Sequence, residues 1–253
     1  MGRAIGVHLL EAEVPLAVFD PDRDACVPLA ERGAVVCANA GEVAGRSDLV
    51  LIVVVDDEQT RGAAKECLEH AGPGAVLALC ASIRPDTCRD LAAEGGEHGV
   101  DVIDAALVRG ERGAEQGRLA LFCGGPAEVI DAVRPAVSPF ATDVLRVGEV
   151  GAGQVAKSVN NLLLWACIRA DYEALRLGRA LGVEPAALRE AVQAGSGANR
   201  PLEEWGMHRL RWPRKDLETA FGLAEEAGVE LPFVSELPAL MDALTVDDLA
   251  ELG

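Results

Sequence analysis

The 253-residue sequence has few aromatic residues, no long apolar run and a shortage of basic side chains. No segment is long and apolar enough to cross a membrane, and no signal peptide is recognisable at the start, so we expect no membrane partner. Lys and Arg number 23 against 41 Asp and Glu, which gives a net charge of −18. Such a charge argues against binding to nucleic acid or to an anionic membrane.

The spacings that build metal sites and disulfide frameworks are also missing. The cysteines are odd in number, scattered, and include no C-x-x-C, while the four histidines show no ligand spacing. The sequence therefore predicts no metal site, and it predicts reduced, buried thiols in a cytoplasmic protein. The cysteines are residues 26, 37, 67, 80, 88, 123 and 167.

Half of the residues are apolar, with Ala, Leu and Val dominant, which is typical of helices packed on a parallel sheet. Short apolar runs alternate with helical stretches through the first two thirds of the chain. This alternation predicts a Rossmann-like, doubly wound α/β domain with a parallel sheet and helices on both faces. Strands are expected at 16–19, 35–37, 48–55, 75–79, 100–103, 119–123 and 144–145, and helices at 24–32, 40–44, 58–71, 85–98 and 127–137.

After residue 148 the strand pattern stops and only helices are expected, at 154–181, 184–194, 216–227 and 231–244. The sequence thus predicts a dinucleotide-binding domain over residues 1–149 and an all-α domain over residues 150–253. The first of these helices is apolar around most of its girth and needs partners on more than one side. A homodimer formed through the C-terminal helices is the simplest way to supply them.

A glycine-rich entry into this long helix carries the most informative residues, Gly151-Ala-Gly-Gln-Val-Ala-Lys157-Ser-Val-Asn160-Asn161. Lys157 and Asn161 are four positions apart and lie on one helix face. A lysine among apolar neighbours can have a lowered pKa and exchange protons near neutral pH, while the asparagine holds the amine or a substrate oxygen. Read from spacing alone, a surface lysine at a helix start fits equally well.

The pattern G-x-G-x-x-x-K-x-x-N-N resembles the catalytic-helix signature of the β-hydroxyacid dehydrogenases, the group of 3-hydroxyisobutyrate dehydrogenase. The resemblance implies an NAD(P)-dependent oxidoreductase that transfers hydride between nicotinamide and a small β-hydroxy acid or related hydroxy or oxo compound, with a carboxylate on the substrate. It implies Lys157 as general acid/base and Asn161 as its catalytic partner. It also implies dimerisation through the C-terminal helices.

The chain begins with a helix rather than with a strand. In a dinucleotide fold, a strand and G-x-G-x-x-G precede this helix. By resemblance, Met1-Gly2 corresponds to the end of that motif, with Gly2 as its third glycine and as a cofactor residue. Either the protein starts upstream, or it lacks the motif and binds dinucleotide poorly. In both cases we expect the chain as written to be less stable and weaker in cofactor binding.

Further cofactor residues follow later strands. Asp20 ends the second strand of the fold, where a carboxylate can accept the adenosine ribose hydroxyls and disfavour a 2′-phosphate. This favours NAD, although the nearby Arg23 leaves NADP open, and Asp20 could instead be a simple helix cap. By resemblance, Val54 and Val55 belong to the loop over the adenosine, and Lys215 belongs to a Lys-Asp motif that reaches the cofactor.

The substrate loop departs from the family pattern. Asp104-Ala-Ala-Leu-Val108-Arg109-Gly110 resembles a loop with the usual form Asp-x-Pro-Val-Ser-Gly-Gly, so Val108, Arg109 and Gly110 are the expected substrate residues. Arg109 could bind a substrate carboxylate in a bidentate manner, or it could point to solvent. Ser82 corresponds to a threonine near the nicotinamide and would contact both substrate and cofactor, unless it only caps the helix that starts at Pro85.

Two other functions remain open on the sequence. Imine or ketone reduction uses the same scaffold, although many imine reductases lack the lysine that stands here at Lys157. A catalytically silent dinucleotide-binding or scaffold protein would fit the missing glycines and the altered substrate loop.

Overall fold

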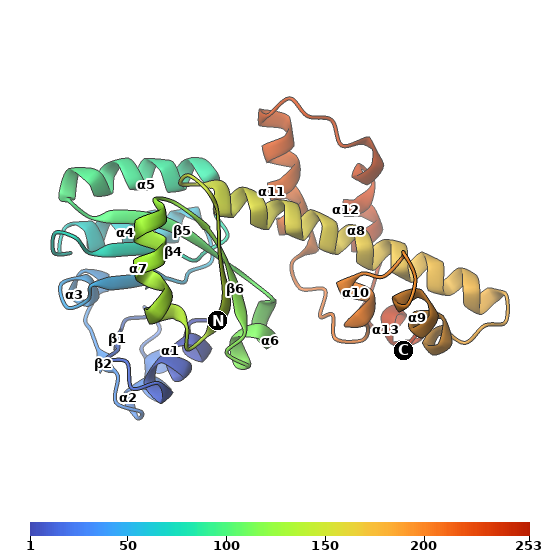
Figure 1. Cartoon of the computed structure of the whole chain (residues 1–253), viewed down its shortest axis with the longest axis horizontal. Helices are drawn as coiled ribbons and strands as arrows, with labels where there is room; N and C mark the ends of the chain where they lie inside the picture. The colour runs from blue at the N-terminus through green and yellow to red at the C-terminus, as the bar shows by residue number, and fades with distance from the viewer. The chain divides into compact units, whose positions relative to one another are not determined.

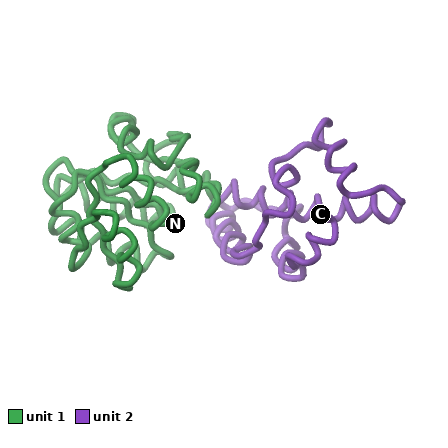
Figure 2. The backbone as a smooth tube through the Cα atoms, turned by 90° about the horizontal axis from the view of Figure 1, so that it is seen from below, with its two compact units in different colours: residues 1–157 green, residues 158–253 purple.

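The computed structural model describes residues 1–253, which form two compact units, residues 1–157 and residues 158–253 (Figure 2). Unit 1 alternates strands and helices, as the sequence predicts. Its strands are β1 (Ala17–Val18), β2 (Val35–Val36), β3 (Leu49–Ile52), β4 (Val76–Leu79), β5 (Asp101–Val108), β6 (Leu119–Gly124) and β7 (Ala141–Gly148). Its helices are α1 (Gly2–Glu11), α2 (Arg23–Ala30), α3 (Ala40–Ala44), α4 (Asp57–Leu68), α5 (Pro85–His98), α6 (Gly110–Glu115) and α7 (Ala127–Val137).

The main sheet has the order β3-β4-β5-β6-β7, and β1 and β2 form a separate parallel pair (Figure 1). The Rossmann-like prediction is confirmed, with two differences: β1 and β2 are separate from the main sheet, and one neighbouring pair within the main sheet is antiparallel. Strands β5 and β6 run antiparallel, whereas the other neighbours in the sheet are parallel. The connection from Val108 to Leu119 explains the antiparallel pair. It is shorter than a parallel crossover, which needs about a dozen residues or more.

Helices cover both faces of the sheet. Successive residues of a strand face opposite sides, and apolar residues on both sides must be buried. In β4, Leu77 and Leu79 pack with α4 and α5, while Ala78 and the following Cys80 pack with α1 and α7. Both sets are at most 3% exposed, so the strand is buried on both faces. This is the arrangement that a continuous apolar run predicts for a parallel strand.

All seven cysteines are free thiols, and six of them are buried in unit 1. Burial raises the pKa of Cys67 and Cys123 to about 12, with smaller electrostatic contributions from nearby groups. Burial also raises the pKa of Cys88. These thiols therefore stay protonated and behave as small apolar core residues.

Unit 2 is entirely helical, as expected. Helix α8 (Ala152–Ala180) begins in unit 1 and continues into unit 2. The predicted single helix at 231–244 is wrong, because that segment breaks into a short 3-10 turn and a separate helix, with Pro232 and Pro238 at their starts. The further elements are α9 (Pro185–Gln193), α10 (Arg200–Glu203), α11 (Pro213–Glu226), η1 (Pro232–Val234), α12 (Leu237–Asp242) and α13 (Val246–Ala250).

Unit 2 has its own core, in which Trp165 and Ile168 of α8 pack with Leu217 of α11 and with Leu249 of α13. No helix in the chain combines the length and the apolar character that crossing a bilayer would require.

Candidate active site

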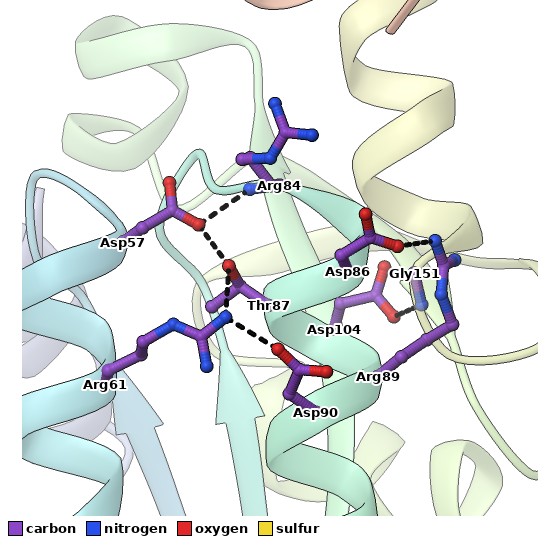
Figure 3. Close-up of polar contacts among 9 residues, drawn as sticks. All are labelled: Asp57, Arg61, Arg84, Asp86, Thr87, Arg89, Asp90, Asp104 and Gly151. Atoms are coloured by element: carbon purple, nitrogen blue, oxygen red, sulfur yellow. Dashed lines mark hydrogen bonds and ion pairs between the residues drawn. The ribbon is translucent and has the colours of Figure 1, made fainter. Parts of the chain in front are cut away.

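The first turn of α8 is anchored to the sheet by a buried carboxylate. Asp104 of β5 is fully buried, and one of its oxygens accepts a hydrogen bond from the backbone N–H of Gly151 at 2.6 Å (Figure 3), while the other accepts from the backbone N–H of Gln154 at 3.0 Å. Burial raises the pKa of Asp104, while these N–H groups and that of Gly153 oppose the rise. An anionic group at a helix N-terminus is stabilised by the unpaired N–H groups and by the helix dipole. Asp104 therefore determines where α8 begins.

The two glycines of the G-x-G pattern allow this close approach. Gly151 has φ +95°, a left-handed conformation that glycine adopts without strain. A Cβ on Gly153 would lie 2.2 Å from the backbone oxygen of Phe122 and 2.6 Å from an Asp104 oxygen. No side chain fits at that position, so the helix reaches β6 only because residue 153 is glycine.

Gln154, on the same turn of α8, holds the loop that follows β4. Its side-chain Nε2 donates to the carbonyl oxygen of Ala81 at 2.8 Å, and its Oε1 accepts from the N–H of Ile83 at 3.3 Å. These two groups lie on either side of Ser82. Ser82 does not cap the next helix, because the N-cap of α5 is Arg84.

The same loop is held from its other end by α4 (Figure 3). Asp57 Oδ1 accepts from the backbone N–H of Arg84 at 3.0 Å and from the Thr87 hydroxyl at 2.5 Å. Arg61 donates to Thr87 at 3.1 Å and forms an ion pair with Asp90 at 2.8 Å. The Ser82 loop is thus held between the starts of α4 and α8.

Lys157 lies one turn beyond Gln154 on α8 and is partly buried. Burial raises the pKa of the Cys80 thiol to about 12, Cys123 adds to the rise, and the charge of Lys157 opposes it. The Lys157 amine is therefore an electrostatic neighbour of the carboxyl end of β4, where the Ser82 loop starts. Asn161 is partly buried on the next turn, and its Oδ1 accepts from Asn160 Nδ2 at 3.1 Å.

The expected substrate loop is part of β5 up to Val108, which is partly buried. Arg109 follows with φ +80°, and Gly110 is exposed with φ +62°. The Arg109 guanidinium forms an ion pair with Asp143 at 2.7 Å and donates to the Thr142 hydroxyl at 2.8 Å. It also donates to the carbonyl oxygen of Arg118 at 3.0 Å, so it is bound within the protein and does not point freely to solvent.

The expected cofactor residues lie at the start of α1 and after β1 and β3. A Cβ on Gly2 would lie 3.9 Å from Val53, which follows β3. Asp20 is exposed, and its Oδ1 accepts from the N–H of Asp22 at 2.9 Å. Asp22 caps α2, so the reading of Asp20 as the cap of this helix does not hold.

Arg23 is engaged with the backbone, since its guanidinium donates to Cys37 O at 2.6 Å and to Ala38 O at 2.9 Å. In the loop after β3, Val54 is partly buried and Val55 is 58% exposed. Lys215 is partly buried in the first turn of α11, in unit 2.

Sequence reasoning missed Gln154 and Asp57 as parts of this site. One signal for Gln154 was present, because it is the polar side chain between the glycines and Lys157 in an otherwise apolar turn. Asp57 carried none, since an acidic residue in the first turn of a helix is ordinary.

Family models match almost the whole chain. Residues 1–148 match the NAD binding domain of 6-phosphogluconate dehydrogenase, and residues 151–252 match the NAD-binding domain of NADP-dependent 3-hydroxyisobutyrate dehydrogenase. An NAD-dependent L-serine dehydrogenase of Pseudomonas aeruginosa is 32% identical over 84% of this chain and 71% of its own length. A 2-(hydroxymethyl)glutarate dehydrogenase of Eubacterium barkeri is 29% identical over 93% of this chain and 83% of its own length.

Solved structures share the fold over the full chain. A 3-hydroxyisobutyrate dehydrogenase of Mycobacterium tuberculosis, determined with L-serine, superposes with a TM-score of 0.89 at 23% identity. The superposition covers all of this chain and 95% of the Mycobacterium tuberculosis chain. A putative oxidoreductase of Mycobacterium avium is 30% identical, with a TM-score of 0.71 and coverage of 98% and 95%.

Proposed function

The chain belongs to the β-hydroxyacid dehydrogenase family, and from this membership we propose that it oxidises the hydroxymethyl group of a small carboxylic acid to an aldehyde. The protein is an NAD(P)-dependent oxidoreductase. The observation that carries the proposal is the anchoring of α8. Asp104 and Gln154 tie the turn before Lys157 to the sheet and to the Ser82 loop.

The residues at the start of α1 fit a dinucleotide. The first turn of α1 contains no acidic residue and has no side-chain cap, so its N–H groups can receive a diphosphate. We propose that Gly2 lies at this diphosphate, that Asp20 accepts the ribose hydroxyls, and that Val54 and Val55 border the adenosine. The Asp20 carboxylate would repel a 2′-phosphate, and Arg23 is already bound to the backbone, so we propose NAD over NADP. By resemblance, Lys215 also contributes to cofactor binding.

In the proposed reaction, the substrate hydroxyl gives its proton to Lys157 Nζ. A hydride leaves the carbon that bears this hydroxyl, and a C=O bond forms. A nicotinamide bound at this site would supply the hydride acceptor for the oxidation and the hydride donor for the reverse reaction. Asn161, one turn along the helix, holds the hydroxyl oxygen and the lysine amine in register. Ser82 donates its hydroxyl to the substrate beside the nicotinamide. General acid–base catalysis of this kind typically contributes a factor of about 10²–10⁴.

Relatives of the chain suggest the class of substrate. L-serine, 3-hydroxyisobutyrate and 2-(hydroxymethyl)glutarate, named for three of them, all carry a hydroxymethyl group on the carbon next to a carboxylate. We propose a substrate of this type for this chain. Val108 and Gly110 would border it, and Arg109 would shape the loop while bound to Asp143.

We also propose that residues 1–149 form the dinucleotide-binding domain and that residues 150–253 form the substrate and dimerisation domain of a homodimer. Exposed apolar side chains along α8 support a dimer, with Val159 53%, Leu163 59% and Leu177 64% exposed. The free thiols support a reducing, cytoplasmic location. The net charge of −18 supports small molecules rather than nucleic acid as ligands.

Replacing Lys157 tests the function directly. A panel of β-hydroxy acids is offered to the wild type with NAD and with NADP, and reduced cofactor is followed by absorbance. With the best substrate, Lys157→Ala should lower kcat by about 10²–10⁴-fold and change the Kd for NAD by less than about twofold, because the lysine is proposed to act on a proton. Lys65→Ala, an exposed lysine on α4, is the matched control and should leave kcat unchanged.

An unchanged kcat in Lys157→Ala would refute the role of the lysine. A wild type that binds NAD but reduces it with no member of the panel would favour the catalytically silent alternative.

A further inference from the structure

The Gln154 side chain joins the lysine-bearing helix to the serine-bearing loop through two hydrogen bonds. Gln154 is 2% exposed, so no water competes for these bonds. It donates to Ala81 O and accepts from Ile83 N–H, the groups that flank Ser82. The Ser82 backbone cannot rotate without breaking at least one of them. Lys157 lies three residues further along the same helix and belongs to the same rigid frame.

We propose that Gln154 is a positioning residue, which sets the distance and orientation between the Lys157 amine and the Ser82 hydroxyl; this rests on the proposed function above. Two groups that act on one substrate from different elements need a fixed spacing, because misplacement by about 1 Å can cost a factor of about 10² in rate. Asp104 fixes where α8 starts, and Gln154 fixes how the Ser82 loop is oriented toward it. Gln154 itself has no part in proton transfer.

A carboxamide matches the chemistry of both partners. A carbonyl oxygen and an N–H group two residues apart need a donor and an acceptor on the same planar group. An ionised glutamate offers acceptors only, so one of its oxygens would face the Ala81 carbonyl oxygen. A protonated glutamic acid restores the donor, and it has nearly the shape of glutamine. Methionine fills a similar volume but leaves both backbone groups unpaired.

Gln154→Glu makes the positioning role dependent on pH. Burial disfavours the charged form and raises the pKa of the new carboxyl above its ordinary value of about 4.3. As the pH falls, the carboxyl takes up a proton and regains the donor to Ala81 O. The ratio of kcat for the variant to kcat for the wild type should therefore rise as the pH falls. Gln116→Glu, which adds the same charge at an exposed position, should keep this ratio flat.

Gln154→Met gives the second measurement. It should lower kcat by about 10²-fold while the Kd for NAD changes less than about twofold, because the residues proposed to bind the diphosphate and the adenosine lie outside the Ser82 loop. Hydrogen exchange of the Ile83 amide should become faster, since its acceptor is gone. This readout does not depend on turnover, and it reports whether the two hydrogen bonds exist in solution.

The outcomes separate the two proposals. Unchanged exchange at Ile83 in Gln154→Met would overturn the inference by showing that the bonds are absent. Faster exchange with an unchanged kcat, or a ratio for Gln154→Glu that does not rise at low pH, would overturn the positioning role. If the proposed function is wrong, the wild type turns over no member of the panel. The positioning role is then wrong as well, because it depends on that function.

Discussion

Gly153→Ala, which adds a single methyl group, should lower both the thermal stability and the kcat of the protein. The added Cβ would lie 2.2 Å from the backbone oxygen of Phe122, whereas ordinary contacts begin at 3.4 Å. Because β6 is an interior strand of the sheet, the start of α8 must move away from it by about 1 Å. The same methyl would lie 2.6 Å from Asp104, so the movement also strains the hydrogen bonds that cap the helix.

Two consequences follow from this displacement. Overpacking of a well-packed site typically costs about 1–3 kcal/mol, so the midpoint of thermal unfolding should fall by several degrees. Lys157 is four residues further along α8 and moves with it. A misplacement of about 1 Å can lower a rate by a factor of about 10², so kcat should fall by roughly that factor.

The matched control is Gly62→Ala in the exposed part of α4, where a Cβ would meet nothing within 4 Å. It should raise stability by about 0.5–1 kcal/mol, the difference in helix propensity between alanine and glycine, and leave kcat unchanged. Calorimetry and initial rates on both variants test the reasoning. A wild-type melting point in Gly153→Ala would refute the steric argument, and a lowered melting point with an unchanged kcat would refute the link from α8 to the active site.

Two further predictions concern charged side chains. Burial raises the pKa of Asp171, whose Oδ2 is buried without a partner, so its contribution to stability is present at low pH and is lost as the pH rises through the raised pKa. Asp171→Asn should therefore raise the melting point near pH 8 more than near pH 4, and a gain that is the same at both would contradict this. Arg109→Ala should change the KM for the hydroxy acid by less than about twofold, because the guanidinium is bound to Asp143. A rise of about tenfold, or 1.4 kcal/mol, would instead show that it binds the substrate.

The alternating order of unit 1 was predictable because each parallel strand is a short apolar run between polar helix starts. The extension of β5 through Ala105 and Ala106 was not, since alanine has little preference for strands. Without that extension, the segment 104–110 looks like a loop, and the antiparallel pairing of β5 with β6 is hidden. The short helix α6 was missed for a similar reason, because its glycines, Gly110 and Gly113, weaken the helix signal.

In the candidate site, too, some features could be predicted from the sequence and others could not. The face shared by Lys157 and Asn161 follows from helix geometry, so local spacing was enough to propose it. The contacts of Gln154 with Ala81 and of Arg109 with Asp143 join residues 73 and 34 positions apart. No local pattern encodes such pairs, because they depend on how strands and helices pack. This is why the alternatives for Arg109 stayed open on the sequence.

The buried cysteines give unit 1 a native set of reporters of local opening. Alkylating reagents attack the thiolate, and a buried thiol with a raised pKa reacts only when its surroundings open. The six thiols are spread over separate parts of the unit: Cys26 in α2, Cys37 after β2, Cys67 in α4, Cys80 after β4, Cys88 in α5 and Cys123 in β6. Mass spectrometry of a timed labelling reaction would therefore give the order in which these parts come apart, without any engineered probe.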